Sequence, residues 1–114
     1  INPLLVEGQV QGGAQMSLGM ALMEEIEIDK KGYVKSDNFS KYHMLNSPQM
    51  PEVKVLTVEG NEPYGPYGAK SVGELSAVAP APAVINAINF ALGTNITTYP
   101  ATPEVIVDSI KKCM

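Results

Sequence analysis

Apolar residues recur at every fourth position between Glu7 and Glu25, and this spacing predicts a helix. The repeating residues are Val10, Ala14, Leu18 and Leu22. The same stretch contains Gly8, Gly12, Gly13 and Gly19. Each glycine inside a helix costs about 1 kcal/mol relative to alanine. We therefore expect another element or a ligand to approach this helix closely.

The middle of the chain alternates between apolar and polar residues, which is typical of strands. The segments 26–29 and 33–36 alternate on either side of Lys30-Lys31-Gly32, a pattern that predicts a β-hairpin. The run Val53–Glu59 is rich in β-branched residues and predicts a further strand. Residues 60–73 contain too much glycine and proline for regular structure.

Two helices are expected near the end of the chain. The first begins around Ala79 to Pro82 and ends before Gly93, which suits a helix C-terminus. Its expected faces are an apolar one (Val84, Ile88, Ala91, Leu92) and a polar one (Asn86, Asn89). The second opens at Thr102-Pro103-Glu104, with a capping threonine, and ends near Lys111-Lys112. The predicted fold class is α+β, one domain over residues 1–114, with the C-terminal helices packed on the sheet.

Composition narrows the possible functions. The chain has 114 residues, 45% of them hydrophobic, and a net charge of −4. All eight basic residues are lysines, which argues against nucleic acid and against an anionic membrane surface as partners. We expect no membrane-spanning run and a cytoplasmic location. Because the chain opens at Ile1 in what reads as the middle of a sequence, we expect it to be a fragment of a longer polypeptide.

The sequence offers no metal-binding cluster, since His43 is the only histidine and Cys113 the only cysteine. Two glycine-rich motifs remain as candidates for chemistry. Gly8–Gly13, placed at a helix start, has backbone N–H groups and glutamine amides that suit a polar ligand, but on the residues alone close helix packing is the favoured explanation of its glycines. Gly68–Glu74 ends in a carboxylate that suits a general base if apolar neighbours shield it. The alternative is a carboxylate that caps the following helix.

Two long segments carry a family resemblance: VEGQVQGGAQMSLGMALMEE and PYGPYGAKSVGELSAVAPAPAVINAI. They closely resemble the C-terminal end of the molybdenum-binding subunit in the xanthine dehydrogenase and aldehyde oxidase family. That family has a GQ-x-x-GG pattern near a helix and GAK-x-VGE before a closing helix. The resemblance extends over roughly Val6 to Ile110, with both motifs in the right order.

The resemblance implies a molybdenum hydroxylase with a molybdopterin (pyranopterin) cofactor, whose molybdenum carries oxo, sulfido and hydroxide ligands. In the family, the glutamate of the VGE motif takes a proton from the hydroxide. The oxygen then attacks an electron-poor carbon of a purine, another N-heterocycle or an aldehyde, while hydride passes to the sulfido ligand. Carried onto this chain, the catalytic base is Glu74. Gln9 matches the glutamine that hydrogen-bonds the pterin, and the backbone of Ser71, Val72 and Gly73 borders the cofactor.

The chain also departs from the family pattern. Ser71 stands where many members have glycine or alanine, and Leu75 where many have proline. The resemblance implies iron–sulfur clusters and FAD on other domains or subunits. We expect the isolated chain to hold no cofactor and to be inactive. The alternative function is a non-catalytic assembly module that keeps the family architecture and binds a partner.

Overall fold

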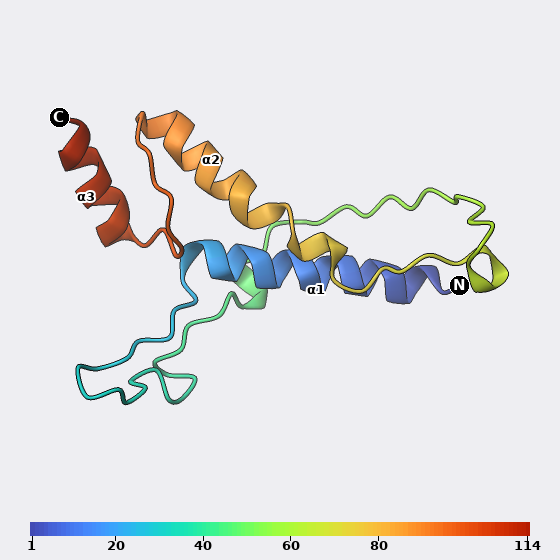
Figure 1. Ribbon diagram of the computed structural model, residues 1–114, viewed down its shortest axis with the longest axis horizontal. Helices are drawn as coiled ribbons and strands as arrows, with labels where there is room; N and C mark the ends of the chain where they lie inside the picture. Colours follow the sequence, from blue (N-terminus) through green and yellow to red (C-terminus); the bar gives the residue numbers. More distant parts are fainter.

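A computed structural model describes residues 1–114 and shows three α-helices joined by long irregular segments (Figure 1). Helix α1 (Pro3–Leu22) lies across the middle of the molecule, followed by the short 3-10 turns η1 (Ser47–Gln49), η2 (Pro66–Gly68) and η3 (Leu75–Ala77). Helices α2 (Pro80–Leu92) and α3 (Pro103–Cys113) complete the chain. Both η3 and α2 pack on α1.

The first helix begins earlier than predicted. Asn2 caps it by accepting a hydrogen bond at Oδ1 from the Leu5 N–H at 3.2 Å, and Pro3 occupies the first turn. The Gly8–Gly13 motif therefore lies inside α1 and not at its start. Only the first four N–H groups of a helix lack partners within it, so this motif is not the helix-terminal ligand site that its glycines suggested.

The buried stripe of α1 also differs from the predicted one. The fully buried residues are small ones: Gly13, Ser17, Gly19 and Ala21. The apolar set that repeats from Val10 is only half-buried. Small side chains let η3 and α2 approach the helix backbone closely, and this approach decides which face is covered.

The predicted sheet is absent, so the α+β assignment is wrong and the fold is helical. The expected hairpin is reduced to one antiparallel bridge between Ile28 and Val34, around a turn in which Gly32 has φ +88°. The Val53–Glu59 run forms no strand, and Leu56 and Val58 are more than 90% exposed. A strand needs a neighbour for its backbone hydrogen bonds, and no other segment of the chain pairs with this one.

The C-terminal helices match their predicted bounds closely. Gly93 ends α2 with φ +63°, the left-handed conformation that glycine adopts most readily, and the Thr102 hydroxyl caps α3. The apolar face of α2 was predicted only in part: Val84 and Ile88 are half-buried, but Ile85 is the buried residue and Ala91 and Leu92 are exposed. A small core lies between α2, the following loop and α3; it contains Ile85, Ile96 and Ala101, with Ile88, Val105 and Ile106 packed against them.

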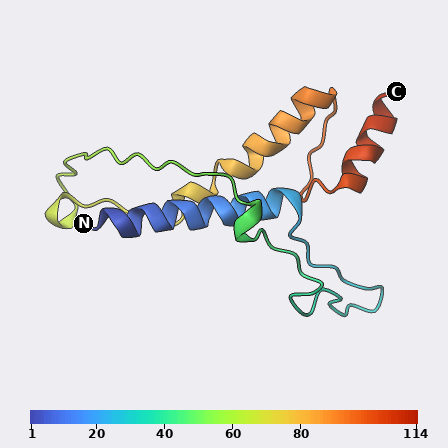
Figure 2. The ribbon, with the colours of Figure 1, turned by 180° about the vertical axis from the view of Figure 1, so that it is seen from behind.

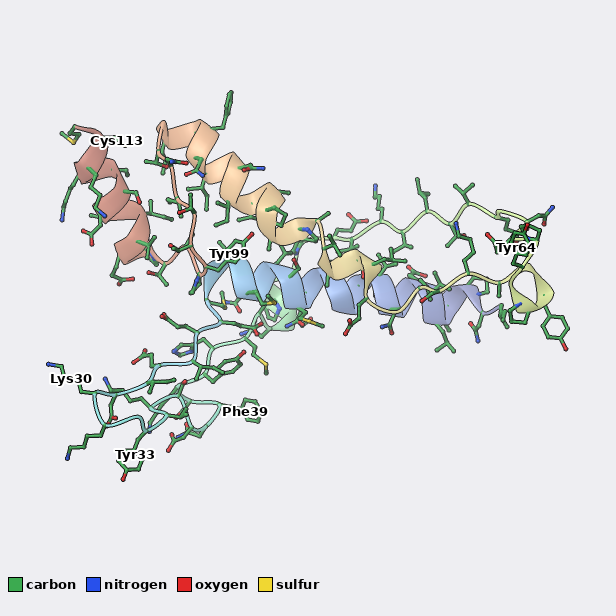
Figure 3. The ribbon with its side chains drawn as sticks, in the orientation of Figure 1. Lys30, Tyr33, Phe39, Tyr64, Tyr99 and Cys113 are labelled. Atoms are coloured by element: carbon green, nitrogen blue, oxygen red, sulfur yellow. The ribbon has the colours of Figure 1, made fainter.

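The molecule is open for its length. Its radius of gyration is 17.9 Å, whereas a compact domain of this size has about 13 Å. Figure 2 shows, from behind, the segment of residues 24–46 and the longer segment between η1 and η3 reaching out from α1 on opposite sides. In Figure 3, Tyr33 and Phe39 lie on the first of these and Tyr64 near the tip of the second.

One segment is more apolar than we expected, since no membrane-spanning run was predicted. Leu75–Leu92 spans 18 residues and is long and apolar enough to cross a membrane, judged by length and composition alone. In the structure it is divided between η3 and α2, both of which pack on α1.

Candidate functional site

A hydrogen bond joins the two glycine-rich motifs. The Gln9 side chain on α1 donates from Nε2 to the Gly73 carbonyl oxygen at 2.6 Å, across 64 residues of sequence. The amide oxygen of Gln9 accepts no hydrogen bond within the chain. The structure therefore brings together two of the residues predicted to hold the cofactor, and leaves the Gln9 oxygen free to accept a hydrogen bond from a ligand.

A second contact lies next to this bond. The Ser76 hydroxyl, in η3, donates to the Gln9 backbone oxygen at 3.3 Å. Ser76 packs directly over Gly13, where an added Cβ would collide with the hydroxyl and lie 3.2 Å from the Ala77 nitrogen. A residue larger than glycine at position 13 would require both Ser76 and Ala77 to shift. Close helix packing, which the sequence left open, thus explains Gly13.

Glu74 lies between these two contacts. It precedes η3, and its carbonyl accepts a hydrogen bond from the Ala77 N–H at 3.0 Å. Its carboxylate makes no hydrogen bond and no ion pair in the chain, so the capping alternative is not realised. The carboxylate is exposed, as are Leu75 and Val78, which were expected to shield it. Within this chain, Glu74 has no structural partner.

The three residues before Glu74 present unused backbone donors. The N–H groups of Ser71, Val72 and Gly73 donate to no acceptor within the chain. A Cβ at Gly73 would meet only the Ser71 hydroxyl, at 4.0 Å, so the chain itself does not require glycine there. Free N–H groups beside an open glycine are suited to a polar group approaching from outside, as the binding of molybdopterin would require.

A groove of about 650 Å³ lies beside this segment. It runs between the first turn of α1 and the loop on either side of η2; its lining includes Leu5, Val6, Val58, Tyr67, Lys70 and Val72. Val72 is half-buried there. Of the predicted site residues, Val72 alone lines this groove, whereas Gln9 and Gly73 meet each other outside it.

No group of three or more histidine, cysteine, aspartate or glutamate side chains gathers anywhere in the chain to hold a metal ion. His43 lines a separate polar hollow with Glu27 and Lys35, far along the sequence from Glu74. Cys113 is exposed at the end of α3.

The sequence predicted a close approach at the glycines of α1, but it did not single out Ser17 or Ser76 as residues that position the site. Gly13 and Ser17 on α1, and Ser76 in η3, make the contacts that hold the Glu74 segment and the start of α2. The signal was present in the sequence, since Gly13, Ser17 and Ala21 are small residues spaced four apart. The predicted buried stripe used the residues one position later instead, because those residues are more apolar.

Known proteins resemble the chain over nearly its whole length. Residues 1–51 match the molybdopterin cofactor-binding domain family. The xanthine dehydrogenase molybdenum-binding subunit of Escherichia coli O157:H7 is 46% identical over 105 residues, which are 91% of this chain and 14% of that subunit. Aldehyde oxidoreductase of Megalodesulfovibrio gigas is 36% identical over 117 residues, covering 96% of this chain and 12% of that protein.

A solved structure shares the fold. The crystal structure of quinoline 2-oxidoreductase from Pseudomonas putida 86 matches 98% of this chain with a TM-score of 0.90 at 33% identity. The match covers 15% of that chain. The present chain thus spans about one seventh of the length of the curated relatives, with 14% of the Escherichia coli subunit covered.

Proposed function

We propose, since this chain belongs to the xanthine dehydrogenase and aldehyde oxidase family of molybdenum-dependent oxidoreductases, that it forms part of the molybdenum-binding subunit of a molybdenum hydroxylase. The reaction is the insertion of a water-derived oxygen into a C–H bond, with release of two protons and two electrons. The substrate is a purine, another N-heterocycle or an aldehyde. Among these we favour a purine or a nicotinate-like heterocycle.

The observation that carries the proposal is the hydrogen bond between Gln9 and Gly73. It holds both family motifs side by side and leaves the Glu74 carboxylate beside them without a structural partner. A carboxylate with no partner in the fold is available to accept a proton in a reaction. Its exposure in this chain means that the shielding a base requires comes from the cofactor and the rest of the subunit.

Each part of the site has a separate role in the proposed reaction. Bound molybdopterin supplies the redox chemistry and carries the molybdenum. The free oxygen of Gln9 and the unpaired N–H groups of Ser71, Val72 and Gly73 would hold the cofactor by hydrogen bonds. Glu74 would accept a proton during the oxygen transfer. Iron–sulfur and flavin groups on other domains or subunits would take up the two electrons.

Replacement of Glu74 by glutamine in the complete enzyme tests this proposal. Glu74→Gln keeps the size of the side chain but cannot accept a proton at neutral pH. We expect molybdenum content to be unchanged by metal analysis and turnover to fall at least about 100-fold, the usual range for loss of a general base. Glu25→Gln, at another exposed carboxylate, serves as the matched control and should turn over at the parent rate.

The same experiment separates the alternative function. A non-catalytic assembly module has no use for a carboxylate at position 74. If Glu74→Gln turned over near the parent rate, the base assignment would be wrong. The Glu74 carboxylate accepts no capping hydrogen bond from a backbone N–H, and this favours the catalytic proposal.

A further inference from the structure

We infer that Gly13 and Ser76 are positioning residues, which set the location of Glu74 by fixing the η3 turn against α1. This inference rests on the proposed function of Glu74 as the proton acceptor. Neither residue touches the proposed reacting atoms. Their contact acts on Glu74 through the backbone of the η3 turn that follows it.

The backbone around Glu74 is held at two points, both on α1. One residue before it, the Gly73 carbonyl accepts from the Gln9 side chain at 2.6 Å. Two residues after it, Ser76 donates to the Gln9 backbone oxygen at 3.3 Å and packs over Gly13. The turn itself is closed by the hydrogen bond from the Ala77 N–H to the Glu74 carbonyl, at 3.0 Å.

No other part of the chain provides an alternative support. The N–H groups of residues 71–73 donate to nothing within the chain, and the Glu74 side chain is free. Among the helical elements, η3 packs on α1 and on its own neighbour in sequence, α2. The face of α1 at Gly13 therefore fixes how far Glu74 stands from the helix.

The tolerance of this contact is small. A methyl group at position 13 would collide with the Ser76 hydroxyl, which can rotate away, but it would also lie 3.2 Å from the Ala77 backbone nitrogen, which cannot. The turn must then shift outward by a few tenths of an ångström and carry Glu74 with it. Because a displacement of about 1 Å at a reacting group can cost on the order of 100-fold in rate, a shift of this smaller size should lower the rate several-fold.

Gly12 provides a matched control. It lies in the same helix, one residue before Gly13, and a Cβ at this position meets nothing within 4 Å in the chain. Glycine-to-alanine replacement raises helix propensity equally at both positions. The two variants therefore differ in the contact with Ser76 and Ala77.

The experiment compares Gly13→Ala, Gly12→Ala and Glu74→Gln, alone and combined, in the complete cofactor-loaded enzyme. We expect Gly13→Ala to lower kcat several-fold, with KM within twofold and molybdenum content unchanged. Gly12→Ala should stay within twofold of the parent. In the Glu74→Gln background, Gly13→Ala should cause no further loss, because its effect passes through Glu74.

A second readout does not depend on activity. Amide hydrogen exchange at Ala77 should be faster in Gly13→Ala than in the parent and unchanged in Gly12→Ala. Ser76→Ala removes the hydrogen bond to Gln9 without adding bulk, and it should reproduce the direction of both effects if Gly13→Ala fails to assemble.

The outcomes are distinct. If Gly13→Ala multiplied the loss caused by Glu74→Gln, it would act independently of Glu74 and the inference would fail. Unchanged exchange at Ala77 in both Gly13→Ala and Ser76→Ala would also overturn it. Full turnover of Glu74→Gln would instead refute the proposed function, while the exchange data would still report whether Gly13 and Ser76 fix the turn.

Discussion

The Ser17 hydroxyl on α1 accepts a hydrogen bond from the Ala81 N–H at 2.9 Å, and Ser17 is only 1% exposed. Ala81 stands in the first turn of α2, where N–H groups have no acceptor within the helix. The residue before α2, Ala79, has no side chain able to cap it. Ser17 therefore caps the N-terminus of α2, although it belongs to another helix.

Replacing Ser17 by alanine should destabilise the contact between α1 and α2. The change leaves the buried Ala81 N–H without an acceptor, which costs about 1–3 kcal/mol. We expect a lower unfolding free energy and faster hydrogen exchange at Ala81. Ser109→Ala removes a hydroxyl that makes no hydrogen bond in the chain, and it should change neither quantity. Equal effects of the two replacements would contradict the capping role.

Asn89 should be necessary for the loop that follows α2. Its side chain accepts from the Ile96 N–H at 2.7 Å and from the Thr94 hydroxyl at 3.0 Å, and donates to the Ile96 carbonyl at 2.9 Å. Asn89→Ala removes all three bonds, so we expect a loss of about 2 kcal/mol in chemical unfolding. Asn86→Ala, on an exposed position of the same helix, should lose less than about 0.5 kcal/mol.

Tyr42 should titrate above the ordinary tyrosine pKa. Its hydroxyl donates to Glu24 Oε2 at 2.8 Å, and this hydrogen bond, with burial and the nearby negative charge, raises the pKa of Tyr42. Because the pKa is raised on folding, the stabilisation is fully present below the ordinary tyrosine pKa and is lost as the pH rises through the raised value. The contact between Tyr42 and Glu24, which lies just after the end of α1, should therefore weaken in alkali.

Ultraviolet absorbance of the phenolate measures this titration. Subtraction of the Tyr42→Phe curve from the parent curve isolates Tyr42, and its midpoint should lie above the ordinary tyrosine pKa. Glu24→Gln removes the negative charge beside the hydroxyl and should lower that midpoint. A Tyr42 midpoint that does not change in Glu24→Gln would contradict the role of Glu24.

The Thr102 cap should contribute to the stability of α3. Its hydroxyl accepts from the Val105 N–H at 3.4 Å, and Thr102→Ala should cost about 1 kcal/mol. Thr102→Ser keeps a capping hydroxyl and should recover most of that loss. Hydrogen exchange at Val105 gives the local measurement; identical exchange in Thr102→Ala and Thr102→Ser would argue against the cap.

Local signals in the sequence predicted the ends of α2 and α3, because capping and left-handed glycine depend on residues close in sequence. Gly93 and Thr102 took the roles expected of them. The strand prediction at Val53–Glu59 failed because pairing depends on a partner that no local pattern reveals. The sequence of this segment alternates as a strand does, but no other segment lies beside it to form backbone hydrogen bonds.

The candidate site was predictable in its motifs but not in its contacts. The resemblance singled out Gln9 and Glu74, and the structure placed the Gln9 side chain on the carbonyl just before Glu74. Nothing in the spacing of the sequence indicated that Gly13 would receive Ser76. Small residues contribute little to a hydrophobicity pattern, although in this chain they form the buried stripe of the longest helix.

Four contacts of α1 fall at every fourth residue, and each reaches a later part of the chain. Gln9 meets Gly73, Gly13 meets Ser76, Ser17 meets Ala81, and the Ala21 carbonyl accepts from the Ala101 N–H at 2.7 Å. One residue inserted within α1 would turn all later contacts by about 100° around the helix. Homologous chains should therefore vary in length in the segments on either side of η1, while the number of residues from Gln9 to Ala21 stays constant.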